Sequence, residues 1–469
     1  MPQDIMVTFL GTSSGGGPTK TRNCSSLIVD MLGDGTLWMV DCAEGTSRQF
    51  ELQPPVGHKA KRGRVATIFV THMHADHTMG LIGFLKAQLG IPRAGVKPVS
   101  TTPSPDHITF YGAFADRWDS SIAQVLKMEL YGPAGLRAFI RTILNMTDSQ
   151  CQDKYVVHEL LGPGEQPSAP CKPGSMRANE MGGRDIVCGD DGFWRECVKV
   201  WSHRAKREIV VDAGRVVHRV PCLGYVIRES PTTWDTKGKD EEAQATALGR
   251  LRKLVLLGDT NDPDGIIPLV NSSPGHVALA VHEATDCYIP DHVDPQQQTG
   301  KNRTTESVHS ISLQRGHSTP GMAGKFANEI GARRLVLNHL GGRFPAPGRS
   351  GNRDSKFREN VMGWIEQQAT EAWAPEQDGA KAQAAVDFLT VFIKPIPVPE
   401  TEQAEPQIQW TQMDRPSSST STSQNSGQTS GHGRRYGRYT SGPPTPNEKD
   451  QRKPQRTERQ AEKRREDVV

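Results

Sequence analysis

Short apolar runs, separated by glycine and polar residues, form the first part of the chain. They suit β-strands, and they span Met6–Leu10, Leu27–Asp30, Leu37–Val40 and Thr67–Val70. The segment Gly80–Leu89 follows with apolar residues at helical spacing. Several strands followed by a helix predict a layered α/β domain.

The same pattern returns later in the chain. Three fully apolar runs, Leu254–Leu257, Val277–Val281 and Leu335–Leu337, predict strands that are buried on both faces. Helical spacing and a closing glycine predict a helix over Pro320–Gly331, and another helix is expected over Leu136–Asn145.

Other segments lack such a pattern and are expected to be insertions, at about 92–128, 162–210 and 289–306. The stretch 162–207, rich in glycine, proline and charge, predicts a surface loop with one hairpin, and 231–248 is expected to be polar and mobile. One folded domain should therefore cover 1–395, and 396–469 should be a tail.

The composition supports this division. Hydrophobic residues make up only 35% of the chain, but they nearly vanish in 396–469, which is rich in serine, threonine, proline and basic residues. We therefore expect a disordered basic tail. A net charge of +3 is too small to mark the whole chain as a nucleic-acid binder.

Composition also excludes several classes of protein. No apolar run is long enough to span a membrane, so no membrane partner is expected. The N-terminus carries an acid and no basic residue, and is therefore expected to be a first strand and not a targeting peptide. The eight cysteines form no CxxC pair, so we expect reduced thiols and no cysteine zinc cluster.

The most informative segment is Thr71-His72-Met73-His74-Ala75-Asp76-His77, directly after an apolar run. Imidazole nitrogens and a carboxylate oxygen are the ligands that zinc-like ions prefer. Four such groups on a loop leaving a buried strand can face two adjacent ions. A solvated loop explains this spacing poorly.

This HxHxDH segment resembles the signature of the metallo-β-lactamase fold, an αββα four-layer sandwich. The resemblance implies further ligands at later strand ends, and the sequence has candidates there. The implied ligands are His72, His74, His218 and Asp259 for one ion, and Asp76, His77, Asp259 and His339 for the other. The resemblance also implies that Asp41 orients the ligand loop and that His282 is structural or lies behind the ligands.

Two further motifs are similar to those of tRNase Z (ribonuclease Z). They are His282-Glu283-Ala284-Thr285 and Gly316-His317-Ser318-Thr319, where that family has a proton-shuttling pair. Phe9–Thr12, Arg22–Ser26 and Tyr131–Leu136 match as well. The resemblance spans about Met6 to Phe344 and implies catalytic roles for Asp76, Glu283 and His317.

The resemblance implies a metal-dependent endoribonuclease that removes 3′ trailers from precursor tRNA and leaves a 3′-hydroxyl. Its cofactors would be two divalent ions, with Zn²⁺ preferred for this set of ligands. Two alternatives stay open: a phosphodiesterase for small or cyclic phosphodiesters, and a non-catalytic RNA-binding protein. A homodimer, a tail that contacts RNA or an acidic partner, and location in the nucleus or cytoplasm rather than the mitochondrion are also expected.

The chain departs from the family in one main respect. Many tRNase Z enzymes carry a flexible arm that grips tRNA between the motifs corresponding to His218 and Asp259. The interval Arg219–Gly258 shows no basic hairpin with a Gly-Pro tip. We therefore expect a divergent member without an obvious arm, and its RNA-binding residues are not predicted.

Overall fold

Two β-sheets pack face to face in the computed structural model, which describes residues 4–55, 59–92, 126–348 and 353–397. The first sheet has the order β16-β1-β2-β3-β4-β5-β6-β7, with β8 also paired to β6. Its strands are β1 (Ile5–Gly11), β2 (Ser26–Asp30), β3 (Leu37–Val40), β4 (Val65–Phe69), β5 (Leu126–Pro133), β6 (Lys154–Leu161), β7 (Glu180–Met181), β8 (Asp185–Val187) and β16 (Thr390–Ile393).

The second sheet has the order β15-β14-β13-β12-β11-β10-β9. Its strands are β9 (Trp194–Ser202), β10 (Arg207–Val216), β11 (Cys222–Glu229), β12 (Arg252–Leu257), β13 (His276–Glu283), β14 (Leu335–Asn338) and β15 (Gln383–Ala384).

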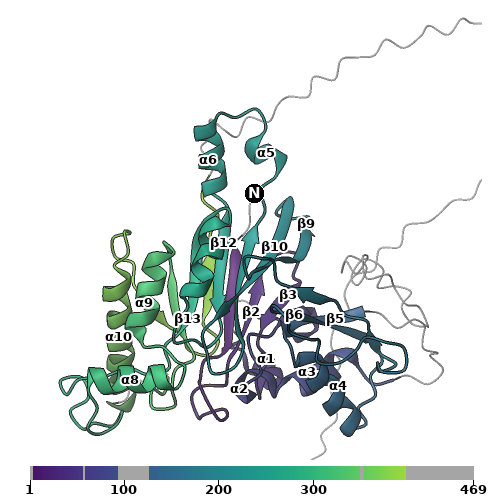
Figure 1. Ribbon diagram of the computed structural model, residues 1–469. Helices are drawn as coiled ribbons and strands as arrows, with labels where there is room; N and C mark the ends of the chain where they lie inside the picture. The colour runs from purple at the N-terminus through teal and green to yellow at the C-terminus, as the bar shows by residue number, and fades with distance from the viewer. Residues whose placement is uncertain (1–3, 56–58, 93–125, 349–352, 398–469) are drawn as a thin grey trace, which may run out of the picture. The chain divides into compact units, whose positions relative to one another are not determined.

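Helices cover the outer face of each sheet (Figure 1). The first set is α1 (Thr46–Leu52), α2 (Ala75–Thr78), α3 (Leu81–Leu89) and α4 (Leu136–Met146). On the side of the second sheet lie α7 (Ile267–Ser272), α8 (Thr305–Gln314), α9 (Pro320–Glu329) and α10 (Arg353–Trp373). Helices α5 (Thr233–Thr236) and α6 (Glu241–Gly249) project past the strand ends. Two short 3₁₀ turns, Arg62–Arg64 and Asp264–Ile266, precede β4 and α7.

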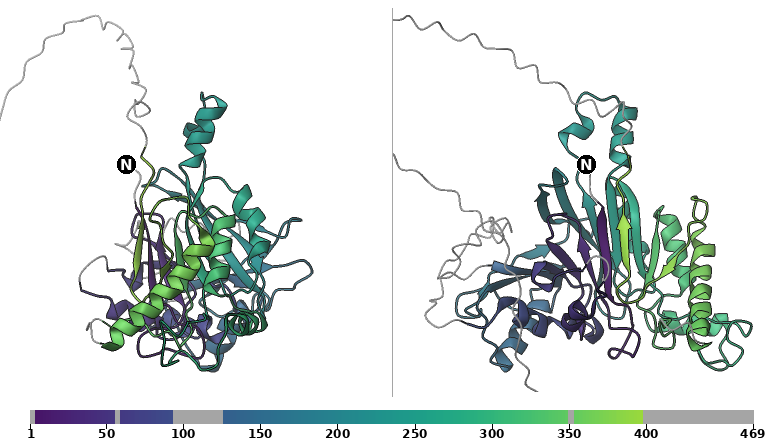
Figure 2. Two further views of the ribbon diagram at one scale, coloured as in Figure 1. Left: turned by 90° about the vertical axis from the view of Figure 1, so that its left-hand side faces the viewer. Right: turned by 180° about the vertical axis from the view of Figure 1, so that it is seen from behind.

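Three apolar clusters hold the layers together. Residues such as Phe9, Trp38 and Tyr225 pack between the two sheets. A second cluster joins α9 and α10 to the second sheet, and a third joins α3 and α4 to the first sheet. Figure 2 shows α10 running across the outer face of its sheet. The predicted αββα sandwich is therefore confirmed.

The strands that lead to the predicted ligands are parallel. Strand β4 runs parallel to β3 and β5, and β12, β13 and β14 run parallel to one another. All five residues of β4 and the first five of β12 are buried, as expected for strands covered on both faces. Because parallel strands end at one edge of a sheet, the loops after these strands converge.

The expectation for 162–207 was right about one hairpin but wrong about a surface loop. The antiparallel strands β9 and β10 form the hairpin, and they extend the second sheet. The polar stretch 231–248 contains α5 and most of α6, which begins with Asp240 accepting a hydrogen bond from the Ala243 N–H. The structure also contains α10, which the sequence pattern did not predict.

Other expectations fall on residues that the structure does not describe. The predicted tail lies outside the described ranges, except for its first two residues, and most of the predicted 92–128 insertion also lies outside them. The predicted boundary at 395 stays a prediction. Among the described residues, no helix combines the length and the apolar character needed to cross a membrane.

Candidate metal centre

All seven predicted ligand residues lie at one edge of the sandwich, where strands end. His72 and His74 follow β4, and Asp76 and His77 belong to the short helix α2. Asp259 follows β12, and His339 follows β14 with a φ of 54°. Such a left-handed backbone is uncommon outside glycine, so the turn after β14 is tightly constrained.

Four of the groups surround one point. The Nδ1 atom of His74 lies 3.0 Å from His72 Nε2 and 3.2 Å from His218 Nε2. Asp259 Oδ2 lies 3.7 Å from His72 Nε2. These atoms all lie within 4.8 Å of one another, which suits shared coordination of one ion.

The remaining groups surround a second point on the other side of Asp259. His77 Nε2 lies 3.3 Å from His339 Nε2, which in turn lies 3.3 Å from Asp76 Oδ2. Asp259 reaches this group too, because its Oδ1 lies 3.4 Å from His77 Nε2. The structure thus places Asp259 between the two groups, where one carboxylate can serve both ions.

Hydrogen bonds on the far side of the rings leave Nε2 free to face the ions. Four imidazoles are held through Nδ1: His72 by Thr71 Oγ1 at 3.0 Å, His77 by Asp41 Oδ2 at 2.7 Å, His218 by the Gly316 carbonyl at 2.6 Å, and His339 by Thr285 Oγ1 at 2.9 Å. An Nδ1–H that donates to these acceptors assigns the lone pair to Nε2. Such partners orient metal-binding imidazoles in known sites.

Asp41 takes the place that the sequence predicts for it. It follows β3 with a φ of 58°, and both oxygens accept hydrogen bonds from Thr71, one from the backbone N–H and one from the hydroxyl. The same carboxylate accepts from His77. Asp41 therefore ties the start of the ligand loop to one of its ligands.

The carboxylates and imidazoles of the centre favour each other's charged forms. Burial would raise the pKa of Asp259, but His339, His77 and His72 outweigh burial and hold it well below its ordinary value. Burial would lower the pKa of His77, but Asp259 and Asp41 raise it well above 6.5. A site that holds a buried carboxylate ionised among imidazoles is suited to bind cations. The donor set therefore fits two divalent metal ions.

Glu283 and His317 form a pair beside the centre. Glu283 is the last residue of β13, and its Oε1 lies 3.0 Å from His317 Nδ1. The backbone N–H of Thr260 donates to the same oxygen, at 2.7 Å. His317 Nδ1 also lies 3.8 Å from Asp259 Oδ2, so the pair borders the groups that face the ions.

His282 does not join the site. Side chains on neighbouring residues of a strand point to opposite faces, and His282 packs against Phe326 of α9 with ring centroids 5.5 Å apart. Its Nδ1 lies 2.8 Å from the Glu283 carbonyl oxygen. Of the two roles considered for His282, this position supports the structural one and not contact with a ligand.

Sequence reasoning missed Thr285, which links the Glu283–His317 pair to the predicted ligand His339. The Thr285 hydroxyl lies between Glu283 Oε2 and His339 Nδ1. A hydroxyl can donate to a carboxylate and accept from an Nδ1–H at the same time, so Thr285 couples the pair to a ligand. It lies in the His-Glu-Ala-Thr motif, two residues after Glu283, and that spacing is the signal available in the sequence.

Known proteins resemble this chain in sequence. A family profile described as "Metallo-beta-lactamase superfamily" matches residues 19–124. The human protein named zinc phosphodiesterase ELAC protein 1 is 27% identical over 72% of this chain and 86% of its own length. A ribonuclease Z of Synechococcus sp. (strain CC9311) is 28% identical, over 76% of this chain and 93% of its own length.

Residues 19–124 of the chain therefore resemble the metallo-β-lactamase superfamily. A solved structure of human tRNase Z, short form, covers 83% of this chain and 99% of its own, with 25% identity and a TM-score of 0.47. Ribonuclease BN of Proteus mirabilis is a further relative, with 25% identity over 72% of this chain.

Proposed function

We propose that this protein is a metal-dependent endoribonuclease that removes 3′ trailers from precursor tRNA. It hydrolyses one phosphodiester bond and leaves a 3′-hydroxyl on the tRNA. The observation that carries the proposal is the Glu283–His317 pair, 3.0 Å apart, beside a set of ligands for two ions. The relatives named ribonuclease Z support it.

When bound, two divalent ions would activate water and neutralise charge on the phosphoryl oxygens. His72, His74 and His218 would hold one ion, and Asp76, His77 and His339 the other, with Asp259 between them. The hydrogen bonds of Thr71, Asp41 and Thr285 keep the imidazoles oriented for this task.

The leaving 3′ oxygen needs a proton, and His317 is placed to supply it. Burial lowers the pKa of His317, but the hydrogen bond and charge of Glu283, together with Asp259, raise it above its ordinary value. Its Nδ1–H is held by Glu283, so Nε2–H is the proton that remains available. General acid catalysis of this kind contributes about 10²–10⁴-fold to a rate.

The interval Arg219–Gly258 is where the resemblance to tRNase Z implies an arm. It contains α5 and α6, which project past the ends of the strands, at the end from which β12 starts (Figure 1). The segment mixes acids and bases, among them Asp235, Lys237 and Glu241. A mixed surface binds RNA phosphates poorly, so the proposed substrate must be gripped elsewhere.

Single-turnover cleavage of a precursor tRNA by the zinc-loaded protein tests the proposal. The wild-type protein should release tRNA that ends in a 3′-hydroxyl, and His317→Ala should slow that step by about 10²–10⁴-fold. His309, an exposed histidine in α8, supplies the matched control, since His309→Ala should leave the rate unchanged.

Two results would contradict the proposal. The wild-type protein could leave the precursor intact while it hydrolyses a small phosphodiester, which would move the activity to another substrate. Alternatively, His317→Ala could cleave as fast as the wild type, which would remove the proton donor from the mechanism.

A further inference from the structure

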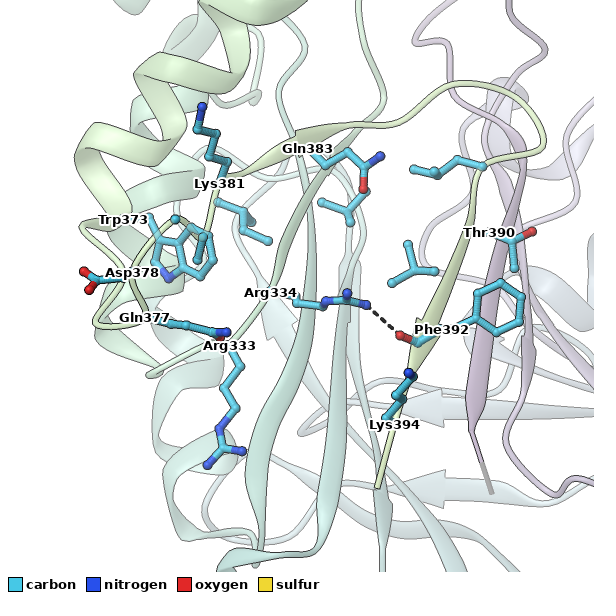
Figure 3. A pocket seen from close by; sticks show the side chains of 16 residues that line it. Arg333, Arg334, Trp373, Gln377, Asp378, Lys381, Gln383, Thr390, Phe392 and Lys394 are labelled. Carbon is cyan, nitrogen blue, oxygen red and sulfur yellow. Dashed lines mark hydrogen bonds between the residues drawn. The ribbon is translucent and has the colours of Figure 1, made fainter. Parts of the chain in front are cut away.

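A groove lies between the edges of the two sheets, away from the metal centre. It has a volume of about 540 Å³ and is bordered by the start of β14, by β15 and β16, and by the end of α10 with the loop that follows. Figure 3 shows Trp373 and Gln377 on one wall and Thr390 and Phe392 on the other. No step of the proposed reaction uses these residues.

Positive charge extends along the groove. Arg333, Arg334, Lys381 and Lys394 line it, whereas Asp378 is the one acid among its lining residues. Figure 3 places Lys381 near one end, Arg334 in the middle, and Arg333 and Lys394 toward the other end. Within the described part of the chain, none of these four cations has an ion pair with a carboxylate. A spread-out row of unpaired cations fits an extended polyanion better than one small anion.

Arg334 is the fixed element of this row. It donates from Nη1 to the Phe392 carbonyl oxygen at 2.6 Å, across the groove (Figure 3). This bond holds the guanidinium in place and leaves its other N–H groups for a ligand. It also occupies a carbonyl of β16 that a peptide would need in order to add as a strand. A strand-forming acidic peptide is therefore a weaker fit than RNA.

The groove also offers an aromatic ring and amides. Phe392 is 45% exposed although it belongs to a strand, and Gln377 and Gln383 add amide groups. Cations that contact phosphates, with an aromatic ring on which a base can stack, are the elements of single-strand binding sites. Amide side chains can hydrogen-bond to the edges of unpaired bases.

We propose that this groove binds single-stranded RNA, and that its ligand is the 3′ trailer of the substrate. This inference rests on the proposed function, in which the trailer is the single-stranded part of a precursor beyond the cut. Arg334 and His339 stand at opposite ends of β14, so the groove lies roughly 17 Å from the metal centre. A long trailer can span that distance, and a very short one cannot.

Trailer length provides the test, with the zinc-loaded, full-length protein. The substrates are one precursor with a trailer of about 2 nucleotides and one with a trailer of about 15 nucleotides, a length within the range of known single-strand sites. The test variant carries Arg333→Gln, Lys381→Gln and Lys394→Gln. Its control carries Lys61→Gln, Lys86→Gln and Lys237→Gln, three lysines that are also exposed.

We expect the test variant to raise KM for the long trailer about tenfold, with kcat unchanged and with the short trailer unaffected within about twofold. The slope of log KM against log salt for the long trailer should fall by roughly 2, the value for three lost phosphate contacts to a single strand. Phe392→Ala should raise the same KM about tenfold through lost stacking. The control variant should match the wild type.

Several outcomes would overturn the inference. An equal rise in KM for both trailers would indicate an effect on the whole substrate and not on the trailer. No rise would show that the groove does not bind the trailer. If a glutamate-rich peptide bound the wild type but not the test variant, while long trailers were cut normally, the ligand would be an acidic protein segment. If the wild type cuts neither precursor, the proposed function fails, and binding of a labelled single-stranded oligonucleotide to wild type and test variant then decides the groove alone.

Discussion

Two clusters of ionisable groups, one where loops of both sheets meet and one on the first sheet, differ in whether their buried groups carry charge. The metal centre holds carboxylates and imidazoles in mutual contact at the ends of the strands. The second cluster, formed by Glu129, Tyr131, His158 and Arg184, lies farther along the same sheet on β5, β6 and the loop before β8. Both contain a buried acid and a buried histidine, but their surroundings differ.

In the second cluster, burial shifts the pKa values more than hydrogen bonds and neighbouring charges do. Burial raises the pKa of Glu129 to about 7, although Tyr131 donates a hydrogen bond to it at 3.0 Å and Arg184 lies near. Burial and the charges of Arg184 and Arg137 lower the pKa of His158 to about 3. His158 instead stacks on the Tyr131 ring, with centroids 4.4 Å apart. This cluster is therefore a packing unit that favours neutral groups.

The difference shows what a metal site requires beyond residue type. In the metal centre, Asp259 has several imidazoles within 4.0 Å, so opposite charges support one another in a buried place. Glu129 has one hydroxyl as its close partner. A buried carboxylate stays ionised only where such partners surround it.

Asp259→Asn should produce the largest effect, because it removes the carboxylate shared by the two groups of ligands. We expect a loss of bound metal, measured by elemental mass spectrometry, and a fall in cleavage rate on the order of 10³-fold or more. Asp291→Asn, at an exposed aspartate, should change neither. Full metal content in Asp259→Asn would show that the centre does not depend on this carboxylate.

Asp41→Asn should also weaken metal binding, but less than Asp259→Asn does. Asparagine tolerates the left-handed backbone at this residue, but its NH₂ group cannot accept the hydrogen bonds from Thr71 and His77. We expect zinc affinity to fall about 10–100-fold, measured by competition with a chelator. Excess zinc should restore most of the cleavage rate. A rate that stays low at saturating zinc would mean that Asp41 does more than orient His77.

Most of the predicted ligands follow or lie close to a recognisable apolar run, and the structure brings all seven together. Parallel strands bring His72, Asp259 and His339 to one edge without any further information. The partners on the far side of the rings are harder to predict. The backbone carbonyl of Gly316 carries no sequence signal, and the hydroxyl of Thr285 is marked only by its spacing from Glu283.

Physical reasons also explain why sequence reasoning missed β9, α6 and the basic groove. Strand β9 carries charged residues such as Arg195 and Lys199 on its exposed side, so its alternation resembles a polar loop. Helix α6 buries little more than Ala247 and shows no apolar stripe. The basic groove joins residues from α10, β14 and β16, so no single stretch of sequence indicates it.

Glu129→Gln tests the comparison between the two clusters by its effect on the stability of the protein. In the unfolded chain a glutamate loses its proton near its ordinary pKa of 4.5, but in the folded protein it does so at about 7. Between these values the folded state binds more protons, so wild-type stability falls as the pH rises from about 4.5 to about 7. Glutamine has no proton to lose. At pH 8 the variant should therefore be more stable, by on the order of 3 kcal/mol.

Urea denaturation at a series of pH values measures this difference. The gain should vanish well below pH 4.5, where Glu129 is protonated in both states, and the cleavage rate should not change, because Glu129 contacts no predicted ligand. Glu329→Gln, at an exposed glutamate in α9, should follow the wild-type curve throughout. If Glu129→Gln were destabilising at pH 8, the carboxylate would be ionised and supported by Arg184, and the two clusters would handle buried charge in the same way.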